Sequence, residues 1–122
     1  MYIADYNNHR AVAWKPDATS GQVVAGGNGK GNQNDQLNGP TVVVIDRKTN
    51  SLIISDQGNR RIVRWSLQNQ TQGQVILNDI CCSGLAIDQE QCLYVSDFEK
   101  DEVQRYRPGE MVGTVVAGGL GR

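Results

Sequence analysis

The chain has 122 residues, of which 39% are apolar and 20% are charged, and these values are ordinary for a globular protein. Its formal net charge is −1 and its 12 lysines and arginines are scattered, which disfavours nucleic acid as a partner. No apolar run reaches the ~18 residues of a membrane span, and the first 20 residues lack the pattern of a secretory signal, so we expect no membrane partner and assign no localisation.

Short apolar runs separated by turn residues predict eleven strands, grouped three, four and four. Residues 26–40 form a long loop rich in glycine and asparagine between the first group and the second. No segment shows a 3.6-residue period long enough for a helix. In chain order, the predicted strands are 1–5, 11–14 and 21–25; then 41–46, 52–56, 61–66 and 73–77; then 84–88, 92–97, 102–107 and 113–117.

One short unit occurs three times in the chain. It consists of an apolar run ending in aspartate, a polar turn, and a second run ending in an aromatic residue. Asp56 follows Asp5 by 51 residues and Asp97 follows Asp56 by 41, and the aromatic residues keep the same two intervals. These aromatic residues are Trp14, Trp65 and Tyr106. Matching intervals at two independent landmarks define an internal repeat, so we expect an array of similar units.

The strongest runs, at 42–46, 52–56 and 93–97, are apolar at successive positions, which indicates sheets covered on both faces. Small antiparallel sheets repeated along a chain and packed on one another are typical of propeller blades. The sequence therefore predicts an all-β fold, a β-propeller with four-stranded antiparallel blades and about 2.75 blades in the chain. We expect one domain over 1–122, with a partial first blade at 1–30, a second at 39–79 and a third at 82–122.

The same residues resemble the NHL repeat of six-bladed propellers. The resemblance rests on an apolar strand ending in Asp, then Asn-x-Arg and an aromatic residue, followed by AGGNGKG, LNGP and VVVID. It covers nearly the whole chain, and Asn8-His9-Arg10 stands near the Asn-His-Leu signature of the family. The third unit departs from the pattern, with Lys100-Asp101-Glu102 at the corresponding place.

The resemblance to this family implies one of four functions: a platform for protein partners, a reader of RNA, a sensor domain, or a lyase with a metal in its channel. An RNA reader needs a basic face, which a net charge of −1 does not supply. The lyase needs several histidine ligands for its metal, and His9 is the one histidine of the chain. We therefore expect a non-catalytic module for binding or assembly, without catalytic, cofactor-binding or metal-binding residues. The alternatives are a propeller domain that binds RNA or another ligand and, more remotely, part of a metal-dependent lyase.

The charged residues of the repeat are expected to stabilise its hairpins. Asp5 and Arg10 flank a four-residue turn, as do Asp56 and Arg61, and each pair should face across two strands and contribute roughly 0.2–1 kcal/mol. In the third unit the facing pair would be Asp97 and Glu102, a like-charge contact unless Lys100 or another arginine lies over it. The structural positions of the repeat are Asp5, Arg10, Trp14, Asp56, Arg61, Trp65, Asp97 and Tyr106.

Two further features, a glycine-rich stretch and three cysteines, resemble binding or reactive sites, but we expect both to have structural roles. The stretch at 26–31, GGNGKG, looks like a phosphate loop, yet no serine or threonine follows Lys30 and no helix follows the loop. Its copy, VVAGGLGR at 115–122, marks it as a connection between blades. Cys81, Cys82 and Cys92 are an odd set without a CxxC pattern, so we expect them to be small buried residues without a disulfide within their hairpin.

The ends of the chain predict assembly. Met1 matches Leu52 and Leu93, which lie four residues before the repeated aspartate in the second strand of their groups, so the innermost strand of the first blade is missing. The chain therefore has the pattern of a fragment, natural or engineered, of a longer array. Propellers typically have about four to eight blades, so three cannot close a ring. Two copies joined head to tail would supply six, and we expect a homodimer that closes a ring, with a protein ligand as a further possible partner.

Overall fold

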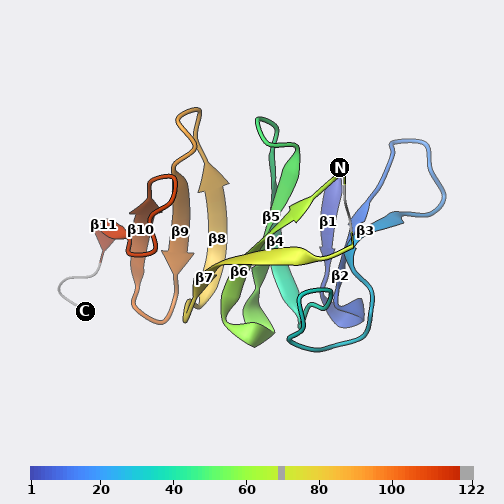
Figure 1. The fold of residues 1–122 in the computed structure, drawn as a ribbon, viewed down its shortest axis with the longest axis horizontal. Coiled ribbons are helices and arrows are strands. Elements are labelled where there is room, and N and C mark those ends of the chain that lie inside the picture. Colours follow the sequence, from blue (N-terminus) through green and yellow to red (C-terminus); the bar gives the residue numbers. More distant parts are fainter. Residues whose placement is uncertain (69–70, 119–122) are drawn as a thin grey trace.

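The computed structural model of the chain, described over residues 1–68 and 71–118, contains three antiparallel sheets that stand side by side (Figure 1). The first sheet has the order β1-β2-β3, the second β4-β5-β6-β7, and the third β8-β9-β10-β11. The strands are β1 (Tyr2–Asp5), β2 (Arg10–Ala13), β3 (Gln22–Gly26), β4 (Pro40–Asp46), β5 (Ser51–Asp56), β6 (Arg61–Ser66), β7 (Gly73–Asn78), β8 (Cys82–Ile87), β9 (Leu93–Asp97), β10 (Glu102–Tyr106) and β11 (Thr114–Gly118).

The all-β prediction and the grouping of three, four and four are confirmed, and each strand end lies within two residues of its predicted place. One landmark moves: Trp14 was expected inside a strand but follows the last residue of β2. Within the described residues the three sheets form an open row, and no ring closes.

The turns of the first two repeat units are single turns of 3₁₀ helix, η1 (Tyr6–Asn8) and η2 (Gln57–Asn59). In the described part of the chain no helix is longer than these, as expected from the absence of helical periodicity. The residue after each turn, His9 or Arg60, is left-handed, with φ of 53° and 52°, and Asp101 at the matching place of the third unit has φ of 52°. The turns of all three units therefore end on a left-handed residue, although only the first two are 3₁₀ helices.

The second sheet is buried on both faces, because successive residues of its strands point to opposite sides. Ile54 and Trp65 pack with Ala11 and Ala25 of the first sheet. On the other side, Ile53, Ile62 and Leu77 pack with residues of the third sheet that include Cys82, Leu93 and Val95. This confirms the burial that the apolar run at 52–56 predicts. The same prediction does not hold for the run at 93–97, where Tyr94 and Ser96 stay partly exposed on the outer side.

Two connections join the sheets, and they differ in length. Residues 27–39, which contain the glycine-rich stretch, lead from β3 to β4, whereas only 79–81 lead from β7 to β8. The longer connection carries one fully buried side chain, Leu37, and is the link between repeat units that the sequence predicts. The second half of its copy at 115–122, residues 119–122, lies outside the described residues.

Candidate functional site: a polar clamp and two outer sheet faces

The predicted pairing of Asp56 with Arg61 is present. The two residues are opposite each other in the register of β5 and β6, and Arg61 Nε donates to Asp56 Oδ2 at 2.7 Å. Their side chains are only 0% and 8% exposed. A buried pair of this kind needs partners for its remaining N–H groups and lone pairs, because an unpaired buried charge is costly.

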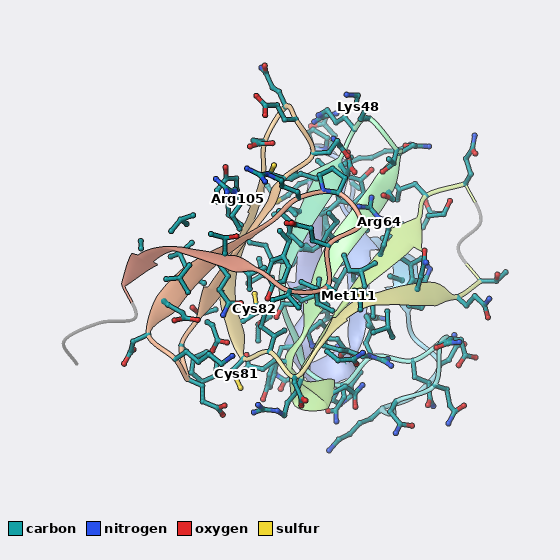
Figure 2. All side chains as sticks on the ribbon, turned by 60° about the vertical axis from the view of Figure 1, so that its left-hand side comes forward. Lys48, Arg64, Cys81, Cys82, Arg105 and Met111 are labelled. Atoms are coloured by element: carbon teal, nitrogen blue, oxygen red, sulfur yellow. The ribbon has the colours of Figure 1, made fainter. Side chains whose placement is uncertain are left out.

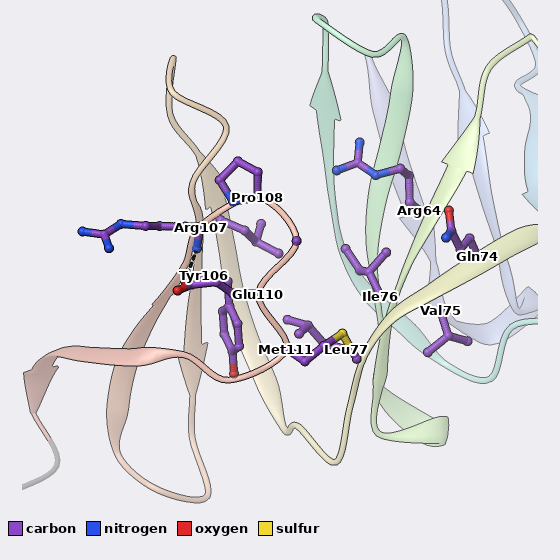
Figure 3. A pocket seen from close by; sticks show the side chains of 12 residues that line it. Arg64, Gln74, Val75, Ile76, Leu77, Tyr106, Arg107, Pro108, Glu110 and Met111 are labelled. Atoms are coloured by element: carbon purple, nitrogen blue, oxygen red, sulfur yellow. Dashed lines mark hydrogen bonds between the residues drawn. The ribbon is translucent and has the colours of Figure 1, made fainter.

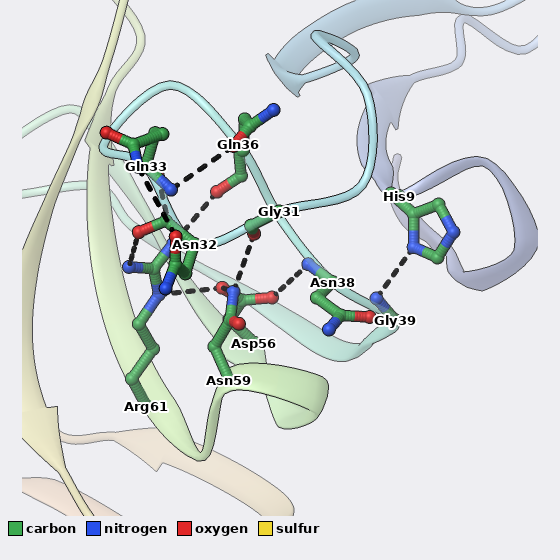
Figure 4. A network of polar contacts seen from close by, with 10 residues as sticks. All are labelled: His9, Gly31, Asn32, Gln33, Gln36, Asn38, Gly39, Asp56, Asn59 and Arg61. Carbon is green, nitrogen blue, oxygen red and sulfur yellow. Dashed lines mark hydrogen bonds and ion pairs between the residues drawn. The ribbon is translucent and has the colours of Figure 1, made fainter.

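Those partners come from the connection between the first two sheets (Figure 4). Arg61 Nη1 donates to the carbonyl of Asn32 at 3.0 Å, and Nη2 donates to the carbonyls of Gln33 at 3.2 Å and Gln36 at 2.9 Å. A guanidinium has five N–H donors in a fixed plane, so one arginine can hold a carboxylate and three carbonyls at once.

The carboxylate side completes the arrangement. Asp56 Oδ1 accepts from the backbone N–H of Asn38 at 2.6 Å, and Asp56 Oδ2 accepts from Asn59 Nδ2 at 2.8 Å. Asn59 Nδ2 also donates to the carbonyl of Gly31 at 2.8 Å. We call Asp56, Asn59 and Arg61 the loop clamp. Sequence reasoning assigned Asp56 and Arg61 only to their hairpin; the sign of a wider role was an arginine whose pairing with one carboxylate leaves most of its donors unused.

The first repeat unit has the same residues without the loop. Arg10 Nε donates to Asp5 Oδ2 at 2.8 Å, and Asn8 Nδ2 donates to both oxygens of that carboxylate. These hydrogen bonds, from Arg10 first and then Asn8, lower the pKa of Asp5. The side chains of Arg10 and Asp5 are 37% and 28% exposed, and within the described residues the guanidinium of Arg10 makes no hydrogen bond beyond Asp5.

The third unit solves its charge conflict through the backbone. Asp97 and Glu102 are opposite each other, as predicted. Asp97 Oδ1 accepts from the backbone N–H groups of Glu99 at 3.0 Å and Lys100 at 3.3 Å, while Glu102 accepts from Gln104 Nε2. The sequence left this contact unfavourable unless Lys100 or an arginine covered it; in the structure, backbone amides of the turn bind the Asp97 carboxylate.

A different contact joins the second and third units at the same edge. Arg60 Nη1 and Nη2 donate to the two oxygens of Glu99 at 2.9 and 3.1 Å, and Arg60 Nη1 also reaches Cys81 Sγ at 2.8 Å. The hydrogen bond from Arg60 holds the pKa of Glu99 at about 2, and burial raises the pKa of the Cys81 thiol. Cys81, Cys82 and Cys92 are all free, and all three are buried, which confirms the predicted burial; Cys82, however, begins β8, whereas the predicted strand begins at residue 84.

The repeated aromatic residues lie against glycines of the next strand. A Cβ added at Gly73 would meet the Trp65 ring at 2.6 Å, and one at Gly21 would meet Trp14 at 2.7 Å. Gly113 has the same relation to Tyr106, also at 2.7 Å. Only glycine allows this approach. Sequence reasoning did not single out these glycines, although each is the first residue of the last predicted strand of its unit.

His9, the one histidine, follows the turn η1, and its Nδ1 accepts from the backbone N–H of Gly39 at 2.9 Å. Among residues 1–68 and 71–118, no three histidine, cysteine, aspartate or glutamate side chains gather in a way that could hold a metal ion. No helix in the described part of the chain is long and apolar enough to cross a membrane.

A cavity of about 340 Å³ lies between the second and third sheets (Figure 3). Arg64 and Gln74 line it from the second sheet, and Tyr106, Glu110 and Met111 line it from the third sheet and the loop that follows β10. Arg64 Nη1 is held from behind by hydrogen bonds of 2.8 Å to a carboxylate oxygen and two hydroxyl groups, those of Asp46, Thr49 and Ser51. The aromatic position of one unit thus lies across the cavity from an arginine of the preceding unit.

The outer side of the first sheet is apolar. Tyr2 and Ala11 point toward the second sheet, so their neighbours Ile3 and Val12 point away from it. The register aligns Ile3 with Val12 and Val12 with Val23 across the three strands, and the Trp14 ring, 37% exposed, lies beside this row. We call Ile3, Val12, Trp14 and Val23 the leading face.

The outer side of the third sheet is mixed. Leu93, Val95 and Tyr106 belong to the cluster shared with the second sheet, so alternate residues point outward. The register places Arg105 opposite Tyr94, and Val103 opposite Ala117. We call Tyr94, Val103, Arg105 and Ala117 the trailing face. Over the described residues, no further strand covers either face.

The predicted structural positions therefore divide into local hairpin pairs, one clamp that reaches across sheets, and aromatic residues that pack on glycines.

No protein-family model matches the chain, and no curated protein matches it.

Proposed function

We propose that the chain is an NHL-type half-propeller whose sheets are blades, and that it acts as a non-catalytic scaffold by associating with a second copy. In this proposal the leading face of one copy covers the trailing face of the other. Two such contacts, related by a twofold axis, close a ring of six blades.

The observation that carries the proposal is that the leading face repeats the residues with which the second sheet covers the first. Ile54, Val63 and Trp65 belong to the cluster between those two sheets, and Val75 packs against it. At the matching places of the first sheet stand Ile3, Val12, Trp14 and Val23, so all four residue types are identical. A surface with these residues is built to cover a sheet face like the one that the second sheet covers.

The trailing face provides the matching surface. The side of the first sheet that receives the second sheet includes Tyr2 and Ala25. The corresponding places in the third sheet are Tyr94 and Ala117, again identical. Junctions of this type already occur twice within the chain, so a third between copies requires no new kind of contact. Burying the leading face would also remove the exposed side chains of Ile3, Trp14 and Val23 from water.

Two acidic variants test the direction of the contact. Val23→Glu places a charge on the leading face, and Val103→Glu places one on the trailing face. Because every junction needs one face of each kind, each variant alone should sediment as a folded monomer of 13.4 kDa. An equimolar mixture should form a dimer through its one intact junction, the trailing face of the first variant with the leading face of the second. Lys48→Glu, on an exposed tip away from both faces, serves as the charge control and should dimerise like the unmodified chain.

A different pattern would contradict the head-to-tail arrangement. If Val103→Glu alone left the dimer intact while Val23→Glu abolished it, two leading faces would be meeting each other. If the mixture stayed monomeric while both variants remained folded by circular dichroism, the faces would not recognise one another.

A further inference from the structure

Arg105 carries the only buried side-chain nitrogen or oxygen without a hydrogen-bond partner in the described part of the chain, its Nε. Its neighbours across the strands are Tyr94 and Thr114. A buried donor without a partner costs free energy, and buried polar groups in native proteins are rarely left so. Figure 2, turned to bring the third sheet forward, labels Arg105 there.

The matching residue of the second sheet, Arg64, has a partner that Arg105 lacks. Asp46 binds Arg64 directly, at 2.8 Å. The carboxylate at the corresponding place in the third sheet, Asp88, instead accepts from the backbone N–H groups of Glu90 and Cys92 and from the Tyr94 hydroxyl. Arg105 acts on Asp88 through its charge but shares no hydrogen bond with it, so the guanidinium of Arg105 is left for another contact.

The junction between the second and third sheets shows what lies opposite this arginine position. Arg64 and Tyr106 line one cavity from its two sides. Tyr106 and Trp14 are the same repeat position, each packed on a glycine of the following strand. A junction between copies with the same geometry therefore places Trp14 of one copy opposite Arg105 of the other.

We propose that the indole ring of Trp14 stacks on the guanidinium group of Arg105 in a second copy, and that this contact sets the register of the junction. The inference rests on the head-to-tail association proposed above. Tryptophan offers the strongest ring face for a cation, and the contact strengthens when water is excluded. Gly21 backs the ring, so the indole is already held in place before association.

The single-junction dimer isolates this contact. In the mixture of Val23→Glu and Val103→Glu copies, Arg105 at the intact junction comes only from the first copy and Trp14 only from the second. Arg105→Met is added to the first and Trp14→Leu to the second, and Kd is measured by sedimentation for the four combinations. Each single change should raise Kd roughly 3- to 30-fold, and the double change by less than the product of the two.

Three results separate the possibilities. If the double combination raised Kd by the full product of the two single changes, the two residues would not be in contact. The copies would still associate, so that result would overturn this inference alone. Loss of the dimer from the starting mixture would instead refute the association itself. Arg47→Met, which removes an exposed charge away from both faces, should leave Kd unchanged, and a shift as large as that of Arg105→Met would reduce the effect to net charge.

Discussion

The two junctions within the chain are closed by different means. Between the first and second sheets, the buried loop clamp holds a thirteen-residue connection, 27–39, through its backbone. Between the second and third sheets the connection is 79–81, and the ion pair there is the half-exposed one of Arg60 and Glu99, beside single hydrogen bonds such as that from Gln91 to Asp46. A cavity remains at the second junction, where Tyr106 stands in place of a tryptophan.

The difference in length between the two connections, 27–39 and 79–81, accounts for the repeat intervals of 51 and 41 residues. A long connection has backbone groups that no strand pairs, and an arginine at position 61 provides donors for three of its carbonyls. A short connection needs little more than the backbone bonds from Ile80 to Arg60 and from Phe98 to Cys81. Position 102 of the third unit corresponds to position 61 of the second. Because it has no long connection to bind, glutamate is tolerated there, whereas the second unit requires arginine.

The largest expected effect comes from breaking the loop clamp. Arg61→Leu should lower the free energy of unfolding by about 3–5 kcal/mol, because Asp56 is left buried without a cation. The matched change Arg10→Leu should cost less than about 1 kcal/mol, since that pair is partly exposed. Urea denaturation at a fixed protein concentration measures both. Asp56→Ala and Arg61→Ala together should be less than additive, and strictly additive losses would show that the two residues act separately.

Filling the glycine under a buried aromatic residue should come next. Gly73→Ala places a Cβ against the Trp65 ring, which is buried and cannot move aside, so we expect a loss of about 3 kcal/mol in the free energy of unfolding. Gly21→Ala makes the same clash with Trp14, whose ring is partly exposed, and should cost about 1 kcal/mol. Equal losses at the two positions would mean that Trp14 is as tightly enclosed as Trp65.

Asp46 should make the stability depend on pH. Burial raises the pKa of this carboxyl, but hydrogen bonds from Arg64, Thr49 and Gln91 outweigh burial and lower its pKa to about 2. Because the folded pKa is below the unfolded value of 3.8, its contribution is complete above about pH 4 and is lost as the pH falls toward 2. The amount lost should be about 2 kcal/mol.

Asp46→Asn removes the titrating group and tests that assignment. The variant should be less stable than the unmodified chain at pH 7, and its stability should change less between pH 4 and pH 2. Urea midpoints across this range measure the difference. An unchanged acid dependence in the variant would assign it to other carboxyl groups.

The smallest effect is expected at the exposed pair of the second junction. Glu99→Gln should shift the urea midpoint less than any variant above, because both side chains of the pair are about half exposed. The unmodified chain should lose this small advantage in high salt, where the attraction is screened. A shift as large as that of Arg61→Leu would remove the distinction between the two junctions.

The strands, their grouping and the register of the repeated hairpins could be predicted from the sequence, because each depends on residues close together in the chain. The pairings Asp5 with Arg10, Asp56 with Arg61, and Asp97 with Glu102 follow from turns of equal length, four residues each. The aromatic positions followed from constant intervals.

What the sequence did not reveal depends on how the sheets lie against one another. The carbonyls of Asn32, Gln33 and Gln36 have no side-chain signature, so nothing in the letters shows that they receive Arg61. The approach of Trp65 to Gly73 and the link from Arg60 to Glu99 likewise join segments that meet only in the folded chain. The cavity beside Arg64 likewise depends on which side chains of the second and third sheets face each other across the junction.

The most direct test of the central claim is the molar mass of the unmodified chain in solution, measured by light scattering over a dilution series. Head-to-tail pairing of leading and trailing faces predicts a particle of twice 13.4 kDa that dissociates on dilution, with no larger species in excess. A well-folded monomer of 13.4 kDa at every concentration would contradict it.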